Sequence, residues 1–313
     1  MVTSKFIRDN ISRFNSNVYR FYDGKYISAW LDEIGALLRF GCSPDDYFRY
    51  EFYRKSNYER DQFITYRRSK KIISKYNHPE KTDIFNNKVK FNTYFHDFIC
   101  REWIDIDKST ESILDAFCEK HGRLIVKPVG GGQGRGIFVW DKDDIESRKI
   151  NLKTCTDCIA EEILVQHKKM KSLNPTSVNT VRVLTFHGKV IAAALRIGGT
   201  GAIVDNLHSN GVCGHIDIET GLIDAPCIDM QYNKYVYHPA THLKLIGFEI
   251  PLWNLVIREV EKASLLLPEV QYIGWDVAIL EDSIALIEGN HDPGHDVVQM
   301  IAQTGIYRNI VKK

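Results

Sequence analysis

Two short apolar runs near the C-terminal end of the chain are separated by a polar turn. The runs cover residues 274–280 and 284–290, and the turn is centred on Asp282. Apolar runs of this length around a short polar turn predict a β-hairpin. Asp276 and Glu288 both lie six residues from the turn centre, so we expect them to face each other across the two strands.

This opposed pair of carboxylates needs a physical reason, because like charges directly opposite each other destabilise a sheet. Asn290 lies two residues after Glu288 and therefore points to the same face of its strand. With Asp276 these side chains form an oxygen-only donor set, which suits Mg²⁺. The pair taken alone is equally compatible with an aspartate at a strand end and a solvated glutamate, so the choice depends on the rest of the chain.

Apolar periodicity along the chain predicts both helices and strands. The expected helices are 27–40, in which Ile27, Trp30, Leu31 and Ile34 share a helical spacing, 109–121 and 251–267. Ser43-Pro44-Asp45-Asp46 is typical of a further helix start. The expected strands, besides the hairpin, are 123–128, 137–140, 160–166, 180–186 and 189–197. Hairpins and helices alternate without a regular strand–helix–strand order, which favours the α+β class.

Residues 1–85 differ in composition from the rest of the chain. They are rich in Tyr, Phe and Arg, as in the run 47–54. Basic, aromatic helices are a feature of nucleic-acid binders, but acidic residues interrupt this region at Asp45, Asp46, Glu51, Glu59 and Asp61. We therefore predict a packed helical region over 1–85.

Composition and charge narrow the class of protein. The chain has 313 residues, 44% of them hydrophobic and 26% charged, and 41 Lys and Arg against 40 Asp and Glu give a net charge of +1. This balance argues against a dedicated nucleic-acid binder, and no apolar run is long enough for a membrane span or signal peptide. The seven cysteines are dispersed, and the pair Cys155 and Cys158 lacks a second pair for zinc, so we expect reduced thiols and a cytoplasmic protein.

A glycine-rich loop joins two of the expected strands. Residues 130–136 contain five glycines, and the strand 137–140 follows them where a dinucleotide-binding or P-loop motif would open a helix. The loop is therefore the tip of a hairpin whose backbone N–H groups are able to cover phosphate oxygens. The alternative is a mobile turn without a ligand. Lys127 favours phosphate, because it ends a buried strand where a cation needs an anionic partner.

These segments, in this order, resemble the ATP-grasp ligases. The resemblance rests on Lys127-Pro128, the glycine hairpin, Glu161-Glu162-Ile163-Leu164-Val165 and the set Asp276, Glu288 and Asn290. Four further stretches resemble the sugar-transfer-associated ATP-grasp group, which is linked to bacterial surface polysaccharides: Ser177-Val178-Asn179-Thr180-Val181-Arg182, Asp205-Asn206-Leu207-His208, Gly274-Trp275-Asp276 and Ile287-Glu288-Gly289-Asn290. The resemblance covers the chain from about residue 88 onward.

The resemblance implies ATP held between two α+β lobes, at 86–160 and 161–313, after the helical region 1–85. It implies that Asp276, Glu288 and Asn290 hold Mg²⁺. It also implies that the nucleotide contacts Lys127, one earlier lysine, the glycine loop and the segment that leads out of the first lobe. These residues are Lys90 (with Lys88 as the alternative), Lys127, Gly131, Gly132, Gln133, Gly134, Glu161, Glu162, Ile163 and Val165.

Three more residues are candidates for the chemistry. Arg182 and Arg196 each interrupt an apolar strand, and a guanidinium there would neutralise the charge of a transferred phosphoryl group or acyl oxyanion, although either side chain is also able to face water. His208 lies in the polar segment 205–215 and is a candidate for binding substrate or accepting a proton, with a purely structural histidine as the alternative.

Together these features predict an ATP- and Mg²⁺-dependent ligase that joins a carboxylate and an amine through an acyl phosphate. The resemblance implies a sugar acid and an amino acid or amine of surface-polysaccharide biosynthesis, with other proteins of that machinery as partners. Two alternatives remain open at this point. One is a kinase of the same fold that phosphorylates a hydroxyl, and the other is a non-catalytic ATP-binding partner of the polysaccharide machinery.

Overall fold

The computed structural model describes residues 12, 14–19, 26–132, 135–144, 156–199 and 211–311. The chain forms two compact units. One contains Met1–Tyr76 and Gly294–Lys313, and the other contains Asn77–Pro293. The C-terminal helices group with the N-terminal ones in the first of these units, whereas the sequence predicts three consecutive ranges.

The first unit is helical, as the sequence predicts for the N-terminal region. Its helices are α2 (Tyr26–Phe40), α3 (Pro44–Arg49), α4 (Asn57–Arg60), α5 (Tyr66–Tyr76), α13 (His295–Ala302) and α14 (Tyr307–Val311), with a 3₁₀ turn at Phe52–Arg54. The predicted start of α3 is confirmed: Ser43 is the N-cap and forms a capping box with Asp46. Buried aromatic side chains form most of the core, among them Phe14, Tyr47, Phe48, Tyr50, Phe52 and Phe63.

Helix α2 is present where the sequence predicts it, but a different face is buried. Ala29, Glu33, Ala36 and Phe40 face the protein, while the apolar residues Ile27, Leu31, Ile34 and Leu38 are exposed among the described residues. Periodicity therefore identified the helix, while packing within the unit decides which of its faces is buried.

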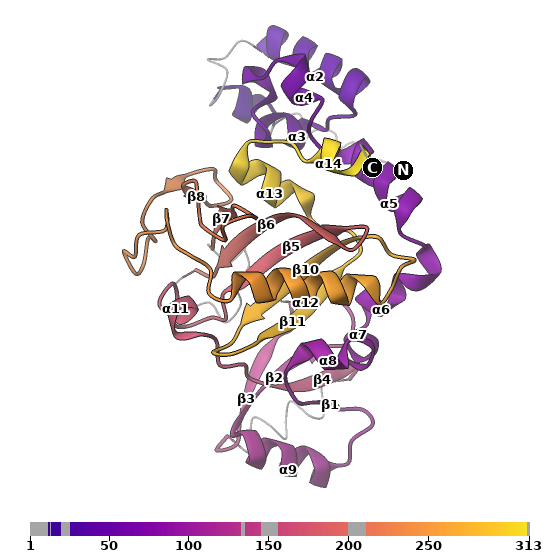
Figure 1. The fold of residues 1–313 in the computed structure, drawn as a ribbon, viewed down its shortest axis with the longest axis vertical. Coiled ribbons are helices and arrows are strands. Elements are labelled where there is room, and N and C mark those ends of the chain that lie inside the picture. The colour runs from indigo at the N-terminus through magenta and orange to yellow at the C-terminus, as the bar shows by residue number, and fades with distance from the viewer. Residues whose placement is uncertain are drawn as a thin grey trace. The chain divides into compact units, whose positions relative to one another are not determined.

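The second unit contains two antiparallel sheets (Figure 1). The smaller has the order β1-β4-β2-β3, and the larger has the order β11-β10-β5-β6-β7-β8-β9. Their strands are β1 (Trp103–Asp105), β2 (Arg123–Pro128), β3 (Phe138–Asp141), β4 (Cys158–Glu162), β5 (Thr180–Phe186), β6 (Lys189–Ile197), β7 (Val212–Ile216), β8 (Cys227–Ile228), β9 (Lys234–Tyr235), β10 (Tyr272–Ile279) and β11 (Ile284–Asn290). The α+β class is confirmed. The strand predicted at 160–166 was displaced: β4 begins at Cys158 and ends at Glu162.

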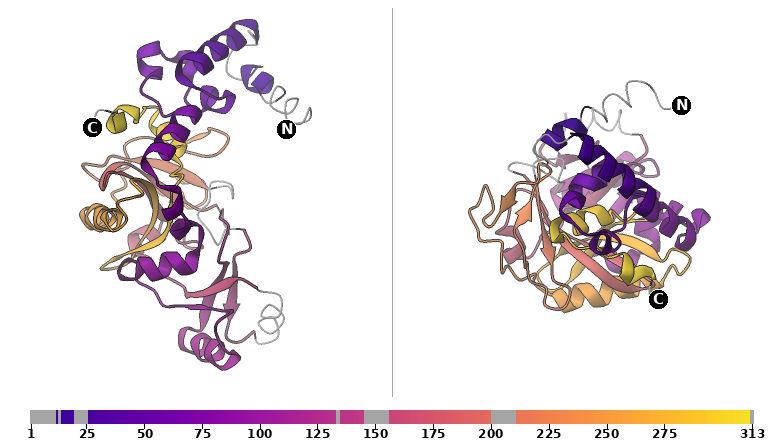
Figure 2. Two further views of the ribbon diagram at one scale, coloured as in Figure 1. Left: turned by 90° about the vertical axis from the view of Figure 1, so that its right-hand side faces the viewer. Right: turned by 90° about the horizontal axis from the view of Figure 1, so that it is seen from above.

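Helices cover one face of the larger sheet. The helices of this unit are a 3₁₀ turn at Pro79–Lys81, α6 (Asp83–Asn86), α7 (Lys88–Tyr94), α8 (His96–Ile99), α9 (Glu111–His121), α11 (Lys168–Lys171) and α12 (Trp253–Leu265). Figure 2 shows α12 end-on beside the curved sheet. Residues of α7 and α12, including Phe91 and Val256, belong to the same core as Trp275 of β10. Residues next to Trp275 in β10, such as Asp276, therefore point to the opposite face.

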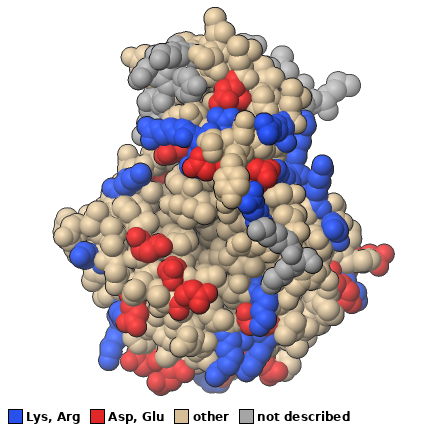
Figure 3. Space-filling model, turned by 45° about the horizontal axis from the view of Figure 1, so that its top comes forward, with Lys and Arg blue, Asp and Glu red and all other residues tan. Residues whose placement is uncertain are grey.

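Surface charge is mixed, in keeping with the near-zero net charge. Figure 3 shows Lys and Arg side chains interspersed with Asp and Glu over the face drawn. In the part of the chain that the structure describes, no helix combines the length and apolarity needed to cross a bilayer.

One expectation about the cysteines needs correction. Cys42, Cys100, Cys118, Cys213 and Cys227 are free thiols, as expected, but Cys158 is disulfide-bonded. Cys155, the other member of the CxxC pair, lies outside the described residues.

Candidate functional site

The predicted hairpin forms, and it brings the two carboxylates together. Asp276 of β10 is directly opposite Glu288 of β11, and Asn290 is opposite Gly274. The Asn290 Nδ2 group donates to Glu288 Oε1 at 3.3 Å. The three side chains that the sequence proposed as metal ligands therefore lie together on the sheet face opposite α12.

A β-bulge produces this register, and the sequence did not reveal it. Val277 pairs with Leu286 while Asp276 pairs with Glu288, so Ile287 is an extra residue in β11. The turn is centred half a residue before Asp282, since Ile279 pairs with Ile284. Without the bulge, a shift of one residue would turn Glu288 to the helix-covered face. The prediction that Asp276 faces Glu288 was correct, but the bulge at Ile287 produces this pairing, and not a turn centred on Asp282.

Two arginines contact Asp276 from neighbouring strands. Arg182 of β5 is directly opposite Asp276, with its Nε 2.7 Å from Asp276 Oδ1. Arg196 of β6 places Nη1 2.9 Å from Asp276 Oδ2. Both arginine side chains are mostly buried, so the alternative in which Arg182 faces water does not describe this structure.

The electrostatics of the carboxylate pair favour a cation. Burial disfavours the charged form of Asp276, but the charges of Arg182 and Arg196 outweigh it and hold the pKa of Asp276 below its ordinary value. Burial and the adjacent charge of Asp276 raise the pKa of Glu288 above its ordinary value. A cation bound between the two carboxylates would favour the charged form of both.

The donor set fits Mg²⁺ in its chemistry, since it offers two carboxylates and an amide oxygen. It is a small set: among the residues that the structure describes, no group of three or more His, Cys, Asp or Glu side chains is arranged to hold a metal ion. Mg²⁺ commonly binds through one or two carboxylates and completes its shell with water and substrate phosphates, so two carboxylates are sufficient for a site shared with a nucleotide.

The polar row continues across the same face of the sheet. Arg182 pairs with Ala194 of β6, which pairs with His215 of β7. His215 Nδ1 lies 2.7 Å from Asp224 Oδ1, beside the bridge between Ile216 and Ile223. Because directly opposed residues share a face, Glu288, Asp276 and His215 lie along one line of the sheet.

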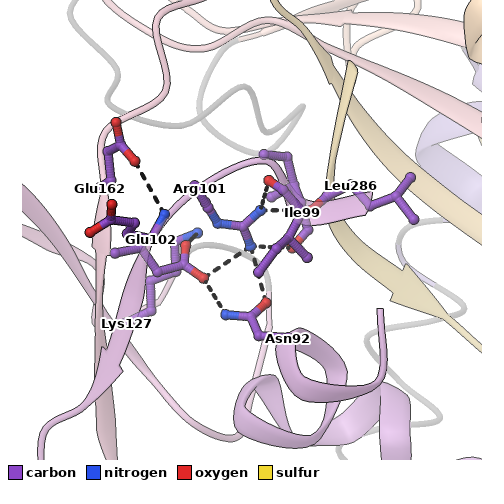
Figure 4. A network of polar contacts seen from close by, with 9 residues as sticks. Asn92, Ile99, Arg101, Glu102, Lys127, Glu162 and Leu286 are labelled. Carbon is purple, nitrogen blue, oxygen red and sulfur yellow. Dashed lines mark hydrogen bonds and ion pairs between the residues drawn. The ribbon is translucent and has the colours of Figure 1, made fainter. Parts of the chain in front are cut away.

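The buried lysine of the first lobe has an anionic partner within the protein. Lys127 Nζ lies 2.6 Å from Glu161 Oε2, and Arg101 Nη2 lies 3.0 Å from Glu161 Oε1. Asn92 Nδ2 also donates to Glu161 Oε1 at 2.9 Å. Burial opposes the charge on Glu161, but Arg101 and Lys127 outweigh it and hold the pKa of Glu161 far below its ordinary value. Figure 4 shows this network around Arg101, Asn92 and Lys127.

The residues predicted to contact adenine do not all point the same way. Glu161 is buried inside the network, whereas Glu162 points to the other face of β4 and accepts from the Glu102 backbone N–H at 3.1 Å. Successive side chains of a strand point to opposite faces, so only one of the two glutamates faces Lys127. Ile163 is half-buried and Val165 is exposed, both after the end of β4.

The structure distinguishes the two candidate lysines at the start of α7. Lys88 Nζ donates to the carbonyl oxygen of Gly131 at 3.2 Å. Burial lowers the pKa of Lys88, the charge of Glu288 partly opposes this shift, and the charge of Lys127 adds to it. Lys90 is exposed and pairs with Asp83. Residues two apart on a helix point about 200° apart, so Lys88 and Lys90 do not both face the site. Lys88, and not Lys90, lies against the glycine loop in this structure.

The glycine loop is a hairpin tip, as the pairing of β2 with β3 shows. Gly131 and Gly132 are exposed at this tip, and Gly131 has a φ of +84°, a backbone conformation that favours glycine. Gln133, Gly134 and His208 lie outside the described residues, so their predicted roles stay predictions.

Sequence analysis did not identify Arg101, Asn92 or the His215–Asp224 pair. Arg101 lies in the short segment between α8 and β1, where no motif draws attention to it. His215 lies at the end of the polar segment 205–215, which was considered as a whole, but its partnership with Asp224 depends on how the chain turns after β7.

Comparison with known proteins places the chain in a family. The model of the sugar-transfer associated ATP-grasp family matches residues 67–313. The structure is similar to the ATP-grasp ligase PsnB complexed with a minimal precursor, with 16% identity over 74% of this chain and a TM-score of 0.47. The aligned part spans only 61% of the PsnB chain. A D-alanine–D-alanine ligase from Bacillus anthracis is 14% identical over 71% of this chain and 67% of its own, with a TM-score of 0.41. No curated protein matches the sequence.

Proposed function

Because the chain belongs to the sugar-transfer associated ATP-grasp family, we propose that it is an ATP- and Mg²⁺-dependent carboxylate–amine ligase. The observation that carries the proposal is the pair Asp276 and Glu288, which are opposed on one sheet face and backed by Arg182 and Arg196. A protein without phosphoryl chemistry has little use for two mostly buried arginines beside the buried Asp276 and the half-buried Glu288, because each buried charge costs free energy unless it is paired.

We assign nucleotide binding to the groups around Lys127. Lys127 and Lys88 supply positive charge for the phosphates, and we assign the backbone N–H groups of the glycine loop, Gly131, Gly132, Gln133 and Gly134, to phosphate binding as well. Ile163 and Val165 offer backbone groups for adenine, next to Glu161 and Glu162. When bound at Asp276, Glu288 and Asn290, Mg²⁺ would neutralise charge on the β- and γ-phosphates.

The proposed reaction has two steps. The substrate carboxylate oxygen attacks the γ-phosphorus, so that an acyl phosphate forms and ADP leaves. The amine nitrogen then attacks the acyl carbon, the C–N bond forms, inorganic phosphate leaves and the nitrogen loses a proton. Arg182 and Arg196 are placed to stabilise negative charge in both steps. The proton acceptor is His208, which the sequence proposed, or His215, which Asp224 orients at the far end of the polar row.

For the substrates, we propose a sugar acid and an amino acid or amine of a bacterial surface polysaccharide, and proteins of that pathway as partners. The association of the family with sugar transfer supports this part of the proposal. A reaction that consumes ATP and modifies precursors of this kind places the protein in the cytoplasm.

A hydroxamate assay tests the proposal. The protein is incubated with ATP, Mg²⁺, hydroxylamine and a panel of uronic acids and amino acids, and ADP release is measured alongside hydroxamate formation. A ligase gives hydroxamate only with its own carboxylate. ADP release with a stable phosphorylated product and no hydroxamate supports a kinase, and nucleotide binding without ADP release across the panel supports a non-catalytic binder.

Two variants test the metal assignment in the same assay. Asp276→Asn and Glu288→Gln keep the shape of each side chain and remove its charge. We expect each variant to reduce ADP release by roughly 100-fold or more and to leave the circular dichroism spectrum unchanged. Loss of a residue that only orients a metal ligand typically costs about 10- to 100-fold, and loss of a ligand itself should cost more. Unchanged activity in both variants would remove the metal assignment.

A further inference from the structure

The orientation of Glu288 depends on one extra residue in β11. The bulge at Ile287 turns Glu288 to the face that carries Asp276. A bulge interrupts the ladder of backbone hydrogen bonds, so its carbonyl groups need other partners. Buried carbonyl groups without partners cost free energy, and a bulge at this position persists only if something satisfies them.

Arg101 supplies those hydrogen bonds. Its Nη1 donates to the carbonyl oxygen of Leu286 at 2.7 Å, and its Nη2 lies 3.3 Å from the carbonyl oxygen of Ile287. These two carbonyls belong to the residues immediately before Glu288. The Arg101 side chain is only 1% exposed, so water does not compete for these bonds. Figure 4 shows Arg101 between Leu286 and the network of the smaller sheet.

The same guanidinium is held from its other side. Arg101 Nη2 also contacts Glu161 Oε1 and the side-chain oxygen of Asn92, and Nη1 donates to the carbonyl oxygen of Ile99 at 3.1 Å. A planar guanidinium presents several N–H groups in a fixed fork, which is why one side chain makes all these contacts at once. A lysine ammonium is a single point charge on a flexible stem and does not reproduce the fork.

We infer that Arg101 is a positioning residue that holds the β11 bulge and thereby sets Glu288 on the metal-binding face. The inference rests on the proposed function, because it assigns Glu288 to the metal. It goes further because it assigns control of Glu288 to a residue in the hydrogen-bond network of the smaller sheet. Arg101 acts through the backbone of β11, and its described hydrogen bonds do not go to Asp276 or Glu288 themselves.

The test measures metal binding directly, with Mn²⁺ as the probe. Mn²⁺ binding to the full chain in the presence of ADP is followed by electron paramagnetic resonance for wild type, Arg101→Lys and Glu288→Gln. Lysine keeps a positive charge beside Glu161, so the substitution removes the fork while Lys127 retains its partner. We expect Arg101→Lys to weaken Mn²⁺ binding about 10-fold, the lower end of the range typical for groups that orient metal ligands.

Arg60→Lys is the matched control. Arg60 is also buried, forms a two-point ion pair with Asp32 and donates to the Phe52 carbonyl oxygen, but it lies in the helical unit. We expect Arg60→Lys to lower thermal stability and to change Mn²⁺ affinity less than 2-fold. Equal loss of Mn²⁺ affinity in both arginine variants would overturn the inference, because it would indicate a general effect of destabilisation.

The outcomes separate this inference from the proposed function. If wild type binds Mn²⁺, Glu288→Gln does not and Arg101→Lys binds as wild type does, the positioning role is wrong while the metal site stands. If Glu288→Gln binds Mn²⁺ as wild type does, the metal assignment itself fails. If Arg101→Lys does not fold, Asn92→Ala carries the test, since it removes one contact from Arg101: at least a 3-fold loss of Mn²⁺ affinity supports the inference, and no change refutes it.

Discussion

Lys127 shows that the sequence can predict the need for an anionic partner without identifying that partner. Its position at the end of a buried strand requires an anionic partner, and the structure supplies one in Glu161. The sequence assigned that anion to phosphate and assigned Glu161 to adenine. Contacts between strands that are far apart in sequence decide which carboxylate approaches which cation, so periodicity could not predict this pair.

Acid sensitivity should reveal the charge on Glu161. The folded-state pKa is depressed below the ordinary value of 4.5, so the stabilisation is fully present above pH 4.5 and is lost as the pH falls below it. Glu161→Gln should cost about 3–5 kcal/mol of unfolding free energy at pH 7, because Arg101 and Lys127 lose a buried counter-charge. The difference from wild type should shrink between about pH 4.5 and 3.

Urea unfolding at a series of pH values measures this difference. Glu162→Gln is the control, because Glu162 is partly exposed, and its effect should stay within about 0.5 kcal/mol. A constant gap between Glu161→Gln and wild type from pH 7 to pH 3 would contradict the expectation.

The two lysines at the start of α7 allow a second test at this scale. Lys88 lies near Gly131 and within the electrostatic reach of Lys127, while Lys90 pairs with Asp83 in solvent. Lys88→Met should weaken binding of ADP with Mg²⁺ roughly 10-fold, the loss expected for one hydrogen bond to a charged group. Lys90→Met should change it less than 2-fold. Isothermal titration calorimetry compares the two, and the reverse order would restore Lys90 as the nucleotide contact.

At the scale of the element, Gly274 of β10 has no room for a larger side chain, and the apolar pattern of the strand does not reveal this. A Cβ atom at Gly274 would lie 2.5 Å from the Pro293 carbonyl oxygen and 3.0 Å from Arg182 Nη1. The strand therefore requires glycine where the chain after β11 passes close to it. Its neighbour Asn290 across the hairpin could be predicted from the sequence, but its neighbour Leu184 in β5 and this close approach could not.

Gly274→Ala should destabilise the protein by about 1–3 kcal/mol, as overpacking of a tight site does, and should reduce ADP release by displacing Arg182. Gly35→Ala is the matched control: Gly35 lies in α2, and nothing stands within 4 Å of its added Cβ. That substitution should stabilise the protein by up to about 1 kcal/mol, because alanine favours a helix interior. Chemical denaturation measures both changes. A neutral Gly274→Ala would show that the backbone relaxes around the new methyl group.

At the scale of the whole molecule, the two ends of the chain form one helical unit, and every described site residue lies in the other. Gln299 of α13 is fully buried and ties the C-terminal segment to the N-terminal one. Its Oε1 accepts from the Ile64 backbone N–H at 2.8 Å, and its Nε2 donates to Tyr50 Oη at 3.2 Å. The helical unit therefore depends on both ends of the chain.

Gln299→Ala should lower the stability of the helical unit by roughly 2–3 kcal/mol, since it leaves buried polar groups without partners. Differential scanning calorimetry should show a shift of that unit's transition, while the stabilisation of the other unit by ADP with Mg²⁺ is kept. Gln62→Ala is the control, because the side chain of Gln62 makes a single, long hydrogen bond among the described residues, from its Nε2 to the Tyr58 carbonyl oxygen at 3.5 Å. Loss of nucleotide stabilisation in Gln299→Ala would contradict independent behaviour of the two units.

The sequence by itself determined the features that are local in the chain. The C-terminal hairpin, the strands 180–186 and 189–197 and the cap of α3 all follow from alternation, turn chemistry and spacing over a few residues. The tertiary structure alone decided the register that sets Glu288 opposite Asp276, the partner of Lys127, the contacts of Lys88 and Lys90, the buried face of α2 and the contacts of Arg101 with β11. Those outcomes depend on packing between segments far apart in sequence, where a single extra residue such as Ile287 reverses the face of a side chain and leaves no trace in the apolar pattern.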